Sequence, residues 1–285
     1  MSINAEDIRL RGHRCCAGCA GAIAERLIFN TVGKKAILFG SGVCVGMSSG
    51  MANLPKLTLH FSGNGGAGAA GIAAGLEVTG RGDIPVIAMG GDGAVSDISI
   101  GQVSACAQRN DNILFFCMDN EAYMNTGVQY STLTPFGSVT TTTPRGSVEW
   151  KKDLPLLVAF HHVPYVATVS PAYPQDLVRK VKKALSIRGY RYIHVLAPCP
   201  TGWGYDPAKS IKVAKAAVTT GLFPLYEIEQ GKLKFTVEVK EQTPVKNYLE
   251  LQKRFRLVKD KEVNFIANHI RERLNQLEEL SKITI

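Results

Sequence analysis

The stretch from Pro85 to Asn125 reads PVIAMGGDGAVSDISIGQVSACAQRNDNILFFCMDNEAYMN, and it decides the fold. Its short apolar runs predict buried strands over 85–89 and 112–118, and the spacing between them predicts a helix over 99–108. Two strands joined by a helix form a βαβ unit, in which the strands are parallel and usually neighbours. We therefore expect an α/β fold with a mostly parallel sheet flanked by helices.

Both strands end in loops that carry phosphate-binding and cation-binding residue types. Gly91, Asp92 and Gly93 follow the first strand, and Asn120 stands 28 positions after Asp92, at the end of the second. Glycines let backbone N–H groups approach phosphate oxygens, while carboxylate and amide oxygens are ligands that suit Mg²⁺. Ligands of α/β proteins bind at the carboxyl ends of the strands. Two ordinary polar turns are the alternative, but the pairing of the loops favours a diphosphate and Mg²⁺ site.

Outward from this unit, the same alternation of strands and helices continues in both directions. Further strands are expected over 36–39, 56–61, 164–168 and 192–196, and helices over 19–29, 154–162 and 174–187. Residues 131–150 lack any periodicity, and we expect them to form a long ordered loop.

The pattern changes after residue 225. A short alternating strand is expected over 232–239, and residues 245–283 are rich in charge with helical spacing. We therefore divide the chain into a domain over 1–225 that holds the cofactors and a small C-terminal extension over 226–285. The extension is expected to pack against another subunit.

Four cysteines stand where the chain is expected to turn. Cys16 and Cys19 form a C-x-x-C pair, whose thiolates can reach one metal ion or cluster. Cys44 in GSGVCVG and Cys199 in APCPTGW have glycine and proline neighbours, which let the backbone bend around a bulky inorganic group. Four such ligands suit tetrahedral zinc or a cubane cluster. The first pair alone also suits a redox dithiol, a zinc half-site or two unrelated cysteines.

The other three cysteines have different surroundings in the sequence. Cys106 and Cys117 lie among apolar residues of a predicted helix and strand, so we expect them in the core. Cys15 neighbours Cys16 but lacks its spacing to Cys19, and its role is not determined by the pattern.

Composition excludes several classes of protein. The 285 residues carry a formal net charge of +9, but no interleaved aromatic and basic pattern indicates a nucleic-acid surface. No apolar run reaches about 18 residues, so no membrane span is expected. The N-terminus, MSINAEDIRL, lacks the features of a signal peptide. We expect a cytoplasmic protein whose cysteines are ligands, redox groups or core residues rather than disulfides.

Six stretches together resemble the beta subunit of pyruvate-type 2-oxoacid:ferredoxin oxidoreductases, which binds thiamine diphosphate. They are GHRCCAGC, GGDGAVSDI, DNEAYMNTGVQ, TPFGSVTTTTPRG, PYVATVSPAYP and APCPTGW, and the resemblance spans residues 10–230. It implies a thiamine-diphosphate-binding fold, with Mg²⁺ and a 4Fe–4S cluster as further cofactors. The cluster ligands of that family match Cys16, Cys19, Cys44 and Cys199.

The resemblance also assigns residues around the organic cofactor. The Mg²⁺ and diphosphate residues of the family match Asp92, Asn120 and the carbonyl of Ala122, and Gly91 and Gly93 flank the first of them. An asparagine that lies beside the reactive ring matches Asn125, our candidate catalytic residue.

The implied activity is the coenzyme A-dependent oxidative decarboxylation of a 2-oxo acid, with pyruvate as first choice. Electrons would pass to the cluster and then to ferredoxin. The resemblance implies an alpha-type partner subunit with the second half of the thiamine site, including its activating glutamate, and a ferredoxin-like subunit. The chain is therefore expected to be inactive alone.

One departure from the family leaves the substrate open. Where the family has a segment such as F-E-N-A-A, this chain has Phe61-Ser62-Gly63-Asn64-Gly65, which lacks the acid. Another 2-oxo acid, or oxalate, is the alternative within the family. Outside it, the alternatives are a non-redox thiamine-diphosphate enzyme with structural cysteines and a scaffold subunit that holds zinc.

Overall fold

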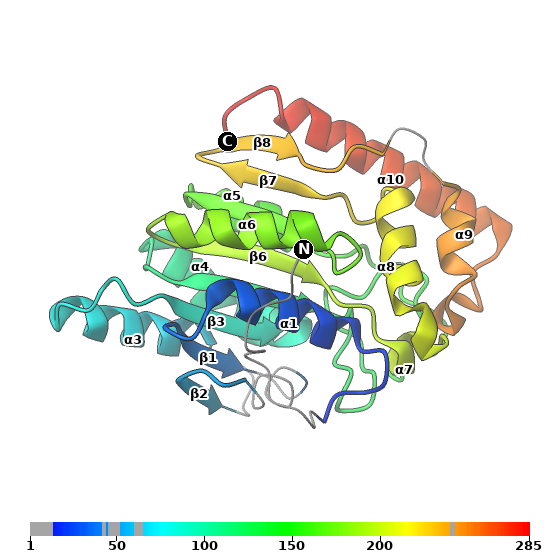
Figure 1. Cartoon of the computed structure of the whole chain (residues 1–285). Helices are drawn as coiled ribbons and strands as arrows, with labels where there is room; N and C mark the ends of the chain where they lie inside the picture. The colour runs from blue at the N-terminus through cyan, green and yellow to red at the C-terminus, as the bar shows by residue number, and fades with distance from the viewer. Residues whose placement is uncertain (1–13, 42–43, 45–51, 60–64, 240–242) are drawn as a thin grey trace.

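The computed structural model describes residues 14–41, 44, 52–59, 65–239 and 243–285. These contain an eight-stranded sheet in the order β2-β1-β3-β4-β6-β5-β7-β8 (Figure 1). The strands are β1 (Ile37–Ser41), β2 (Lys56–Leu59), β3 (Val86–Gly91), β4 (Leu114–Asp119), β5 (Tyr165–Val169), β6 (Arg191–Leu196), β7 (Tyr226–Glu229) and β8 (Lys232–Phe235).

Strands β1 to β6 pair in parallel, and β7 and β8 are antiparallel. The predictions of a mostly parallel sheet and of β3 and β4 as neighbours are confirmed, with Ile87 opposite Leu114. Each residue of β4 and β6 is buried, because helices cover both faces of a parallel sheet and leave no strand face in water.

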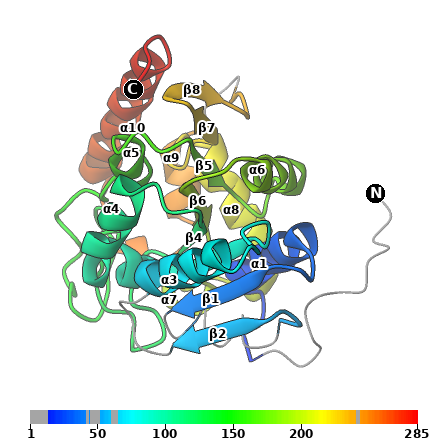
Figure 2. The ribbon, with the colours of Figure 1, turned by 90° about the vertical axis from the view of Figure 1, so that its left-hand side faces the viewer.

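The helices form a layer on each face of the sheet (Figure 2). Helices α1 (Ala20–Val32) and α6 (Pro174–Ser186) lie on one face, and α3 (Gly65–Val78), α4 (Ile100–Gln108) and α5 (Leu154–Ala159) lie on the other. Two apolar clusters fill the space between these layers and the sheet. None of the helices in the described part of the chain is long and apolar enough to cross a membrane.

The remaining helices are a short one before α4 and a group that follows β6 in the sequence. A π-helix, η1 (Ala94–Ile98), precedes α4, and α7 (Pro200–Trp203), η2 (Pro207–Lys209) and α8 (Ser210–Thr219) follow β6. The last are α9 (Val245–Leu249), η3 (Lys253–Phe255) and α10 (Asp260–Leu280). A third apolar cluster joins them to α8 and Trp203. The proposed boundary at residue 225 stays a prediction.

Several predicted elements differ from the observed ones. The helix expected over 154–162 ends at Ala159, because His162 adopts a left-handed φ of 56° that a helix does not tolerate. The strand expected over 232–239 ends at Phe235, and its partner β7 was not predicted. Residues 131–150 contain neither helix nor strand, as expected for a long ordered loop.

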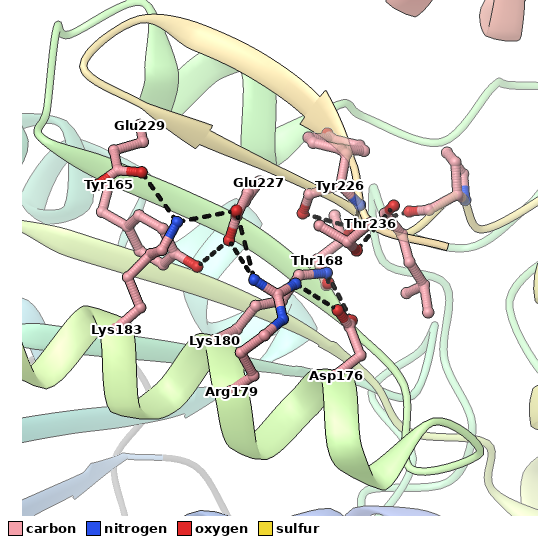
Figure 3. A network of polar contacts seen from close by, with 12 residues as sticks. Tyr165, Thr168, Asp176, Arg179, Lys180, Lys183, Tyr226, Glu227, Glu229 and Thr236 are labelled. Atoms are coloured by element: carbon pink, nitrogen blue, oxygen red, sulfur yellow. Dashed lines mark hydrogen bonds and ion pairs between the residues drawn. The ribbon is translucent and has the colours of Figure 1, made fainter. Parts of the chain in front are cut away.

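Polar contacts tie the β7–β8 hairpin to α6 and β5 (Figure 3). Glu227 of β7 accepts hydrogen bonds from Tyr165 at 2.9 Å and from Lys183 at 2.9 Å. The Thr168 hydroxyl donates to the carbonyl of Pro224 at 2.7 Å, where the chain enters the hairpin. The hairpin is therefore a part of the sheet that is joined to the parallel strands by both backbone and side chains.

Candidate functional site

The candidate site residues gather at one edge of the sheet. The parallel register aligns the ends of β1, β3, β4 and β6, because Ser41 lies opposite Gly90, Gly91 opposite Met118, and Asp119 opposite Leu196. The loops after these four ends carry Cys44, Asp92, Asn120 and Cys199. Four segments that are distant in sequence thus reach the position where α/β proteins bind ligands.

Asp92 is a buried carboxyl group with few compensating partners. Its side chain is 2% exposed and accepts a hydrogen bond from the Ser131 hydroxyl at 2.6 Å. Burial, and after it the charge of Asp119, raise the pKa of Asp92 well above its ordinary value. A bound divalent cation would offset both effects and favour the ionised carboxylate.

The Asn120 side chain meets the other two candidate cation ligands. Its amide lies 2.8 Å from the carbonyl oxygen of Ala122 and 3.0 Å from Asp92 Oδ1. With its nitrogen toward them the amide donates to both, and with its oxygen toward them three oxygens share one point. A carboxylate, an amide and a backbone oxygen are the donor set that Mg²⁺ takes with a phosphate ligand. The residues present therefore fit Mg²⁺.

Gly93 lies tightly against the loop after β4. The Tyr123 hydroxyl donates to the Gly93 carbonyl at 3.0 Å and to Asp97 Oδ2 at 3.2 Å. A Cβ atom at Gly93 would lie 2.5 Å from the Tyr123 ring, whereas one at Gly91 would meet nothing within 4 Å. The first glycine thus leaves open space at the strand end, and the second permits the two loops to approach each other.

Asn125 lies in a turn at the surface of the same loop. A β-bridge between Tyr123 and Gln129 closes this turn, and Asn125 is exposed within it. The Thr126 hydroxyl donates to the Tyr123 carbonyl at 3.2 Å and stabilises the turn from inside. Asn125 is therefore available to a molecule outside this chain, and its assignment as the catalytic residue stays a prediction.

The four candidate ligand cysteines converge from separate segments. Cys19 caps the N-terminus of α1, and the amide of Ala20 donates to the Pro198 carbonyl at 3.4 Å, beside Cys199. Desolvation, and after it the charges of Cys199, Cys19 and Cys16, raise the pKa of Cys44 to about 12. The thiolate form of Cys44 is therefore disfavoured beside the other three cysteines, a situation that a bound metal centre reverses.

Among the residues that the structure describes, no group of three or more Cys, His, Asp or Glu side chains is close enough to hold a single ion. Sulfurs around one zinc lie within about 4.6 Å of each other, twice the Zn–S bond, whereas a cluster gives each thiolate an iron of its own. The Gly202 amide also donates to Cys199 Sγ at 3.4 Å, because Cys199 is the N-cap residue of α7.

The remaining cysteines are placed as follows. Cys106 and Cys117 are buried in the core, which confirms the prediction for both. Cys15 is half-buried beside Cys16. No disulfide joins any of the seven cysteines, all of which lie in the described ranges. The segment 61–64, in which the acid of the family is missing, lies outside the described residues.

Charged residues behind the cation site were not predicted. Asp119 is fully buried, and its carboxylate lies 2.5 Å from Lys151 Nζ and 2.8 Å from His194 Nε2. Burial opposes its ionisation, but Lys151 and His194 hold the pKa of Asp119 at about 2. The position of Asp119 beside Asn120 was the available signal, since a buried strand end with an acid requires a cationic partner.

A cavity of 430 Å³ lies away from the loops that carry the candidate cofactor residues. Lys151 and His194 line it on the side of the cation site, and Trp150, which stacks on His269 with ring centres 3.6 Å apart, lines another wall. The candidate cofactor residues Asp92, Asn120 and Asn125 do not line it. A cofactor held by those residues would therefore bind at the open sheet edge, where a second subunit can cover it.

Comparison with known proteins gives matches along the chain. Residues 45–195, more than half of it, match the family of the thiamine pyrophosphate enzyme C-terminal TPP binding domain. Pyruvate synthase subunit PorB of Methanocaldococcus jannaschii is 42% identical over 97% of this chain and 98% of that protein. Ketoisovalerate oxidoreductase subunit VorB of Pyrococcus furiosus is 36% identical over 99% of this chain and 96% of that protein.

A solved structure supports the fold. The 2-oxoglutarate:ferredoxin oxidoreductase from Magnetococcus marinus, with 2-oxoglutarate, coenzyme A and succinyl-CoA bound, superposes with a TM-score of 0.62. The match covers 75% of this chain and 81% of that chain, at 22% sequence identity. The expected thiamine-diphosphate-binding fold is thereby confirmed.

Proposed function

Because the chain belongs to the family of 2-oxoacid:ferredoxin oxidoreductase subunits, we propose that it holds the diphosphate of thiamine diphosphate through Mg²⁺ and carries a 4Fe–4S cluster. The observation that carries the proposal is the convergence of Asp92, Asn120 and Ala122 oxygens at the carboxyl end of the sheet.

The chain's own residues perform binding and orientation. Asp92, Asn120 and the Ala122 carbonyl would hold Mg²⁺, which neutralises the diphosphate. Gly91 leaves space for phosphate oxygens at the end of β3. Asn125 lies on the surface of the adjacent turn and would face the reactive end of the cofactor. Thiamine diphosphate, when bound, supplies an electron sink for decarboxylation of the substrate.

Cys16, Cys19, Cys44 and Cys199 would hold the cluster at the same sheet edge. Their convergence is supported by the effect of the other three cysteines on the pKa of Cys44 and by the hydrogen bond from the Ala20 amide to the Pro198 carbonyl, which joins the segments of Cys19 and Cys199. The cluster would accept electrons one at a time and pass them to ferredoxin.

Pyruvate is the proposed substrate, with coenzyme A as the acyl acceptor. Four pyruvate synthase subunits PorB are 40–44% identical to this chain, whereas PorB and VorB of Pyrococcus furiosus are both 36% identical to it. A branched 2-oxo acid is the second candidate, because the VorB match covers 99% of the chain.

The proposed partners complete the site. An alpha-type subunit would cover the open sheet edge and supply the second half of the thiamine site, and a ferredoxin-like subunit would carry electrons away. The exposed position of Asn125 supports this, since its side chain is open to a partner subunit.

The test is Mg²⁺-dependent binding of thiamine diphosphate to the chain co-purified with its partner subunits. Asp92→Asn keeps the shape of the side chain and removes its charge, so we expect at least a hundredfold weaker binding. The substitution Asp83→Asn, in the loop before β3, serves as the charge-matched control. Equal binding by wild type and Asp92→Asn would overturn the assignment.

The same complex tests substrate and cluster. We expect pyruvate- and coenzyme A-dependent reduction of ferredoxin, with slower reduction by 2-ketoisovalerate. Cys199→Ser should abolish ferredoxin reduction, whereas Cys15→Ser should retain it. Faster turnover of 2-ketoisovalerate would favour the second substrate.

A further inference from the structure

Arg254 belongs to the C-terminal extension but reaches the loop that follows β4. It lies in η3, is only 3% exposed, and places a guanidinium nitrogen 2.6 Å from Glu121 Oε2. The centre of the guanidinium lies 3.6 Å from the centre of the Trp203 ring. A buried arginine that contacts a carboxylate and an aromatic face at once is fixed in position on both sides.

Through Trp203, Arg254 acts on the backbone of the cation site. Trp203 is fully buried at the end of α7, and its indole N–H donates to the carbonyl of Asn120 at 2.7 Å. The guanidinium covers the face of the same ring. The orientation of Asn120 therefore depends on a ring that Arg254 holds in place.

Through Glu121, Arg254 acts on the two candidate cation ligands of this loop, Asn120 and the Ala122 carbonyl. Glu121 has a left-handed φ of 66°, a conformation that a non-glycine residue keeps only where its surroundings enforce it. Its carboxylate is held by Arg254 and by Lys151 at 2.7 Å, and its carbonyl accepts from Thr134 at 2.8 Å. Glu121 lies between Asn120 and Ala122, so its backbone sets the direction of both.

The contacts of Arg254 with Trp203 and with Glu121 both act on the segment Asn120-Glu121-Ala122. We infer that Arg254 is a positioning residue, which holds the Asn120 side chain and the Ala122 carbonyl in the geometry that a divalent cation requires. The inference rests on the proposed Mg²⁺–diphosphate function of that loop. The C-terminal extension would then act in cofactor binding, in addition to any contact with another subunit.

The experiment uses the chain assembled with its partner subunits and freed of cofactor with a chelator. The Mg²⁺ concentration that half-saturates thiamine diphosphate binding is measured by calorimetry for Arg254→Met, together with thermal unfolding. Arg256→Met, two residues away and exposed, is the matched control. Val181→Ala in the core of α6 controls for a general loss of stability.

We expect Arg254→Met to need at least tenfold more Mg²⁺, while Arg256→Met and Val181→Ala bind as wild type does. A lower unfolding temperature with an unchanged Mg²⁺ requirement would overturn the inference and leave Arg254 a packing residue. If Arg254→Met does not fold, the Mg²⁺ requirement is measured for Arg254→Lys instead, because lysine keeps the charge but loses the planar stack on Trp203. Failure of wild type to bind thiamine diphosphate with Mg²⁺ would instead contradict the proposed function.

Discussion

At the scale of single residues, the two glycines of the motif Gly91-Asp92-Gly93 have different roles. Gly91 faces open space, but Gly93 is packed beneath the Tyr123 ring, where a Cβ atom would lie 2.5 Å from ring carbons. The sequence predicted that this motif ends a strand and binds phosphate. It could not predict which glycine is sterically required, because Tyr123 comes from the next strand's loop.

Gly93→Ala should therefore destabilise the folded chain. Overpacking of this kind costs about 1–3 kcal/mol, so the unfolding midpoint in urea should fall. Gly101→Ala is the control, since that glycine is exposed in α4 and a Cβ atom there meets nothing within 4 Å. It should be neutral or stabilise by about 0.5–1 kcal/mol. An unchanged midpoint for Gly93→Ala would contradict the packing assigned to Tyr123.

Asn125 differs from Gly93 because its side chain is exposed, so replacing it should leave the fold intact. We expect Asn125→Ala to change stability by less than about 0.5 kcal/mol and to bind thiamine diphosphate normally. The kcat of the assembled enzyme should fall about a hundredfold if the side chain acts at the reactive centre. Thr126→Ala in the same turn is the control for turn geometry, and an equal loss in both variants would count against a specific role for Asn125.

At the scale of elements, Lys180 connects α6 to β5 from a fully buried position. Its ammonium group lies 2.7 Å from Asp176 and donates to the Thr168 carbonyl at 2.7 Å (Figure 3). Burial lowers the pKa of Lys180 to about 8, although Asp176 opposes this shift. Asp176 also pairs with Arg179 at 2.8 Å, so it keeps a partner when Lys180 is replaced.

The free energy of unfolding should therefore depend on pH through Lys180. Below about pH 8 the amine is protonated in both states, and the cost of burying its charge is constant. Between the folded pKa of about 8 and the ordinary value of 10.5, the unfolded chain binds the proton and the folded chain does not. Stability of wild type relative to Lys180→Met should rise by about 3 kcal/mol across this window.

Urea unfolding of wild type and Lys180→Met at about pH 7.5, 9 and 10.5 measures this difference directly. Groups that titrate in both proteins, such as the cysteines, cancel in the comparison. Lys182→Met, an exposed residue on the same helix, should show no such slope relative to wild type. Parallel pH profiles for wild type and Lys180→Met would show that the buried amine does not titrate in this range.

The elements near the site were predictable because they are encoded locally. The apolar runs of β3 and β4 and the helix between them predict two parallel, neighbouring strands. The loops that carry the site residues are then expected at the carboxyl ends of these strands. The position of β6 between β4 and β5, and the antiparallel β7, depend on which strands meet after the chain crosses over. Local periodicity carries no information on that choice.

At the scale of the whole molecule, distant segments build one edge of the sheet. Cys16 and Cys19 come from the entry to α1, Cys199 from the exit of β6, and Arg254 from beyond the hairpin. The cysteines were candidates from the sequence because their spacing and their glycine and proline neighbours are unusual, and their role as ligands stays a prediction. The role of Arg254 could not be predicted, because the sequence does not distinguish it from the other basic residues. Only its contacts with Glu121 and Trp203 do so.

We propose that this chain carries a redox cluster beside a thiamine diphosphate site. The most direct test is the iron, acid-labile sulfide and zinc content of anaerobically purified protein. We predict about four irons and four sulfides per chain, as one cubane requires, with loss of both in Cys199→Ser. About one zinc and no sulfide would contradict the claim and favour a scaffold subunit without electron transfer.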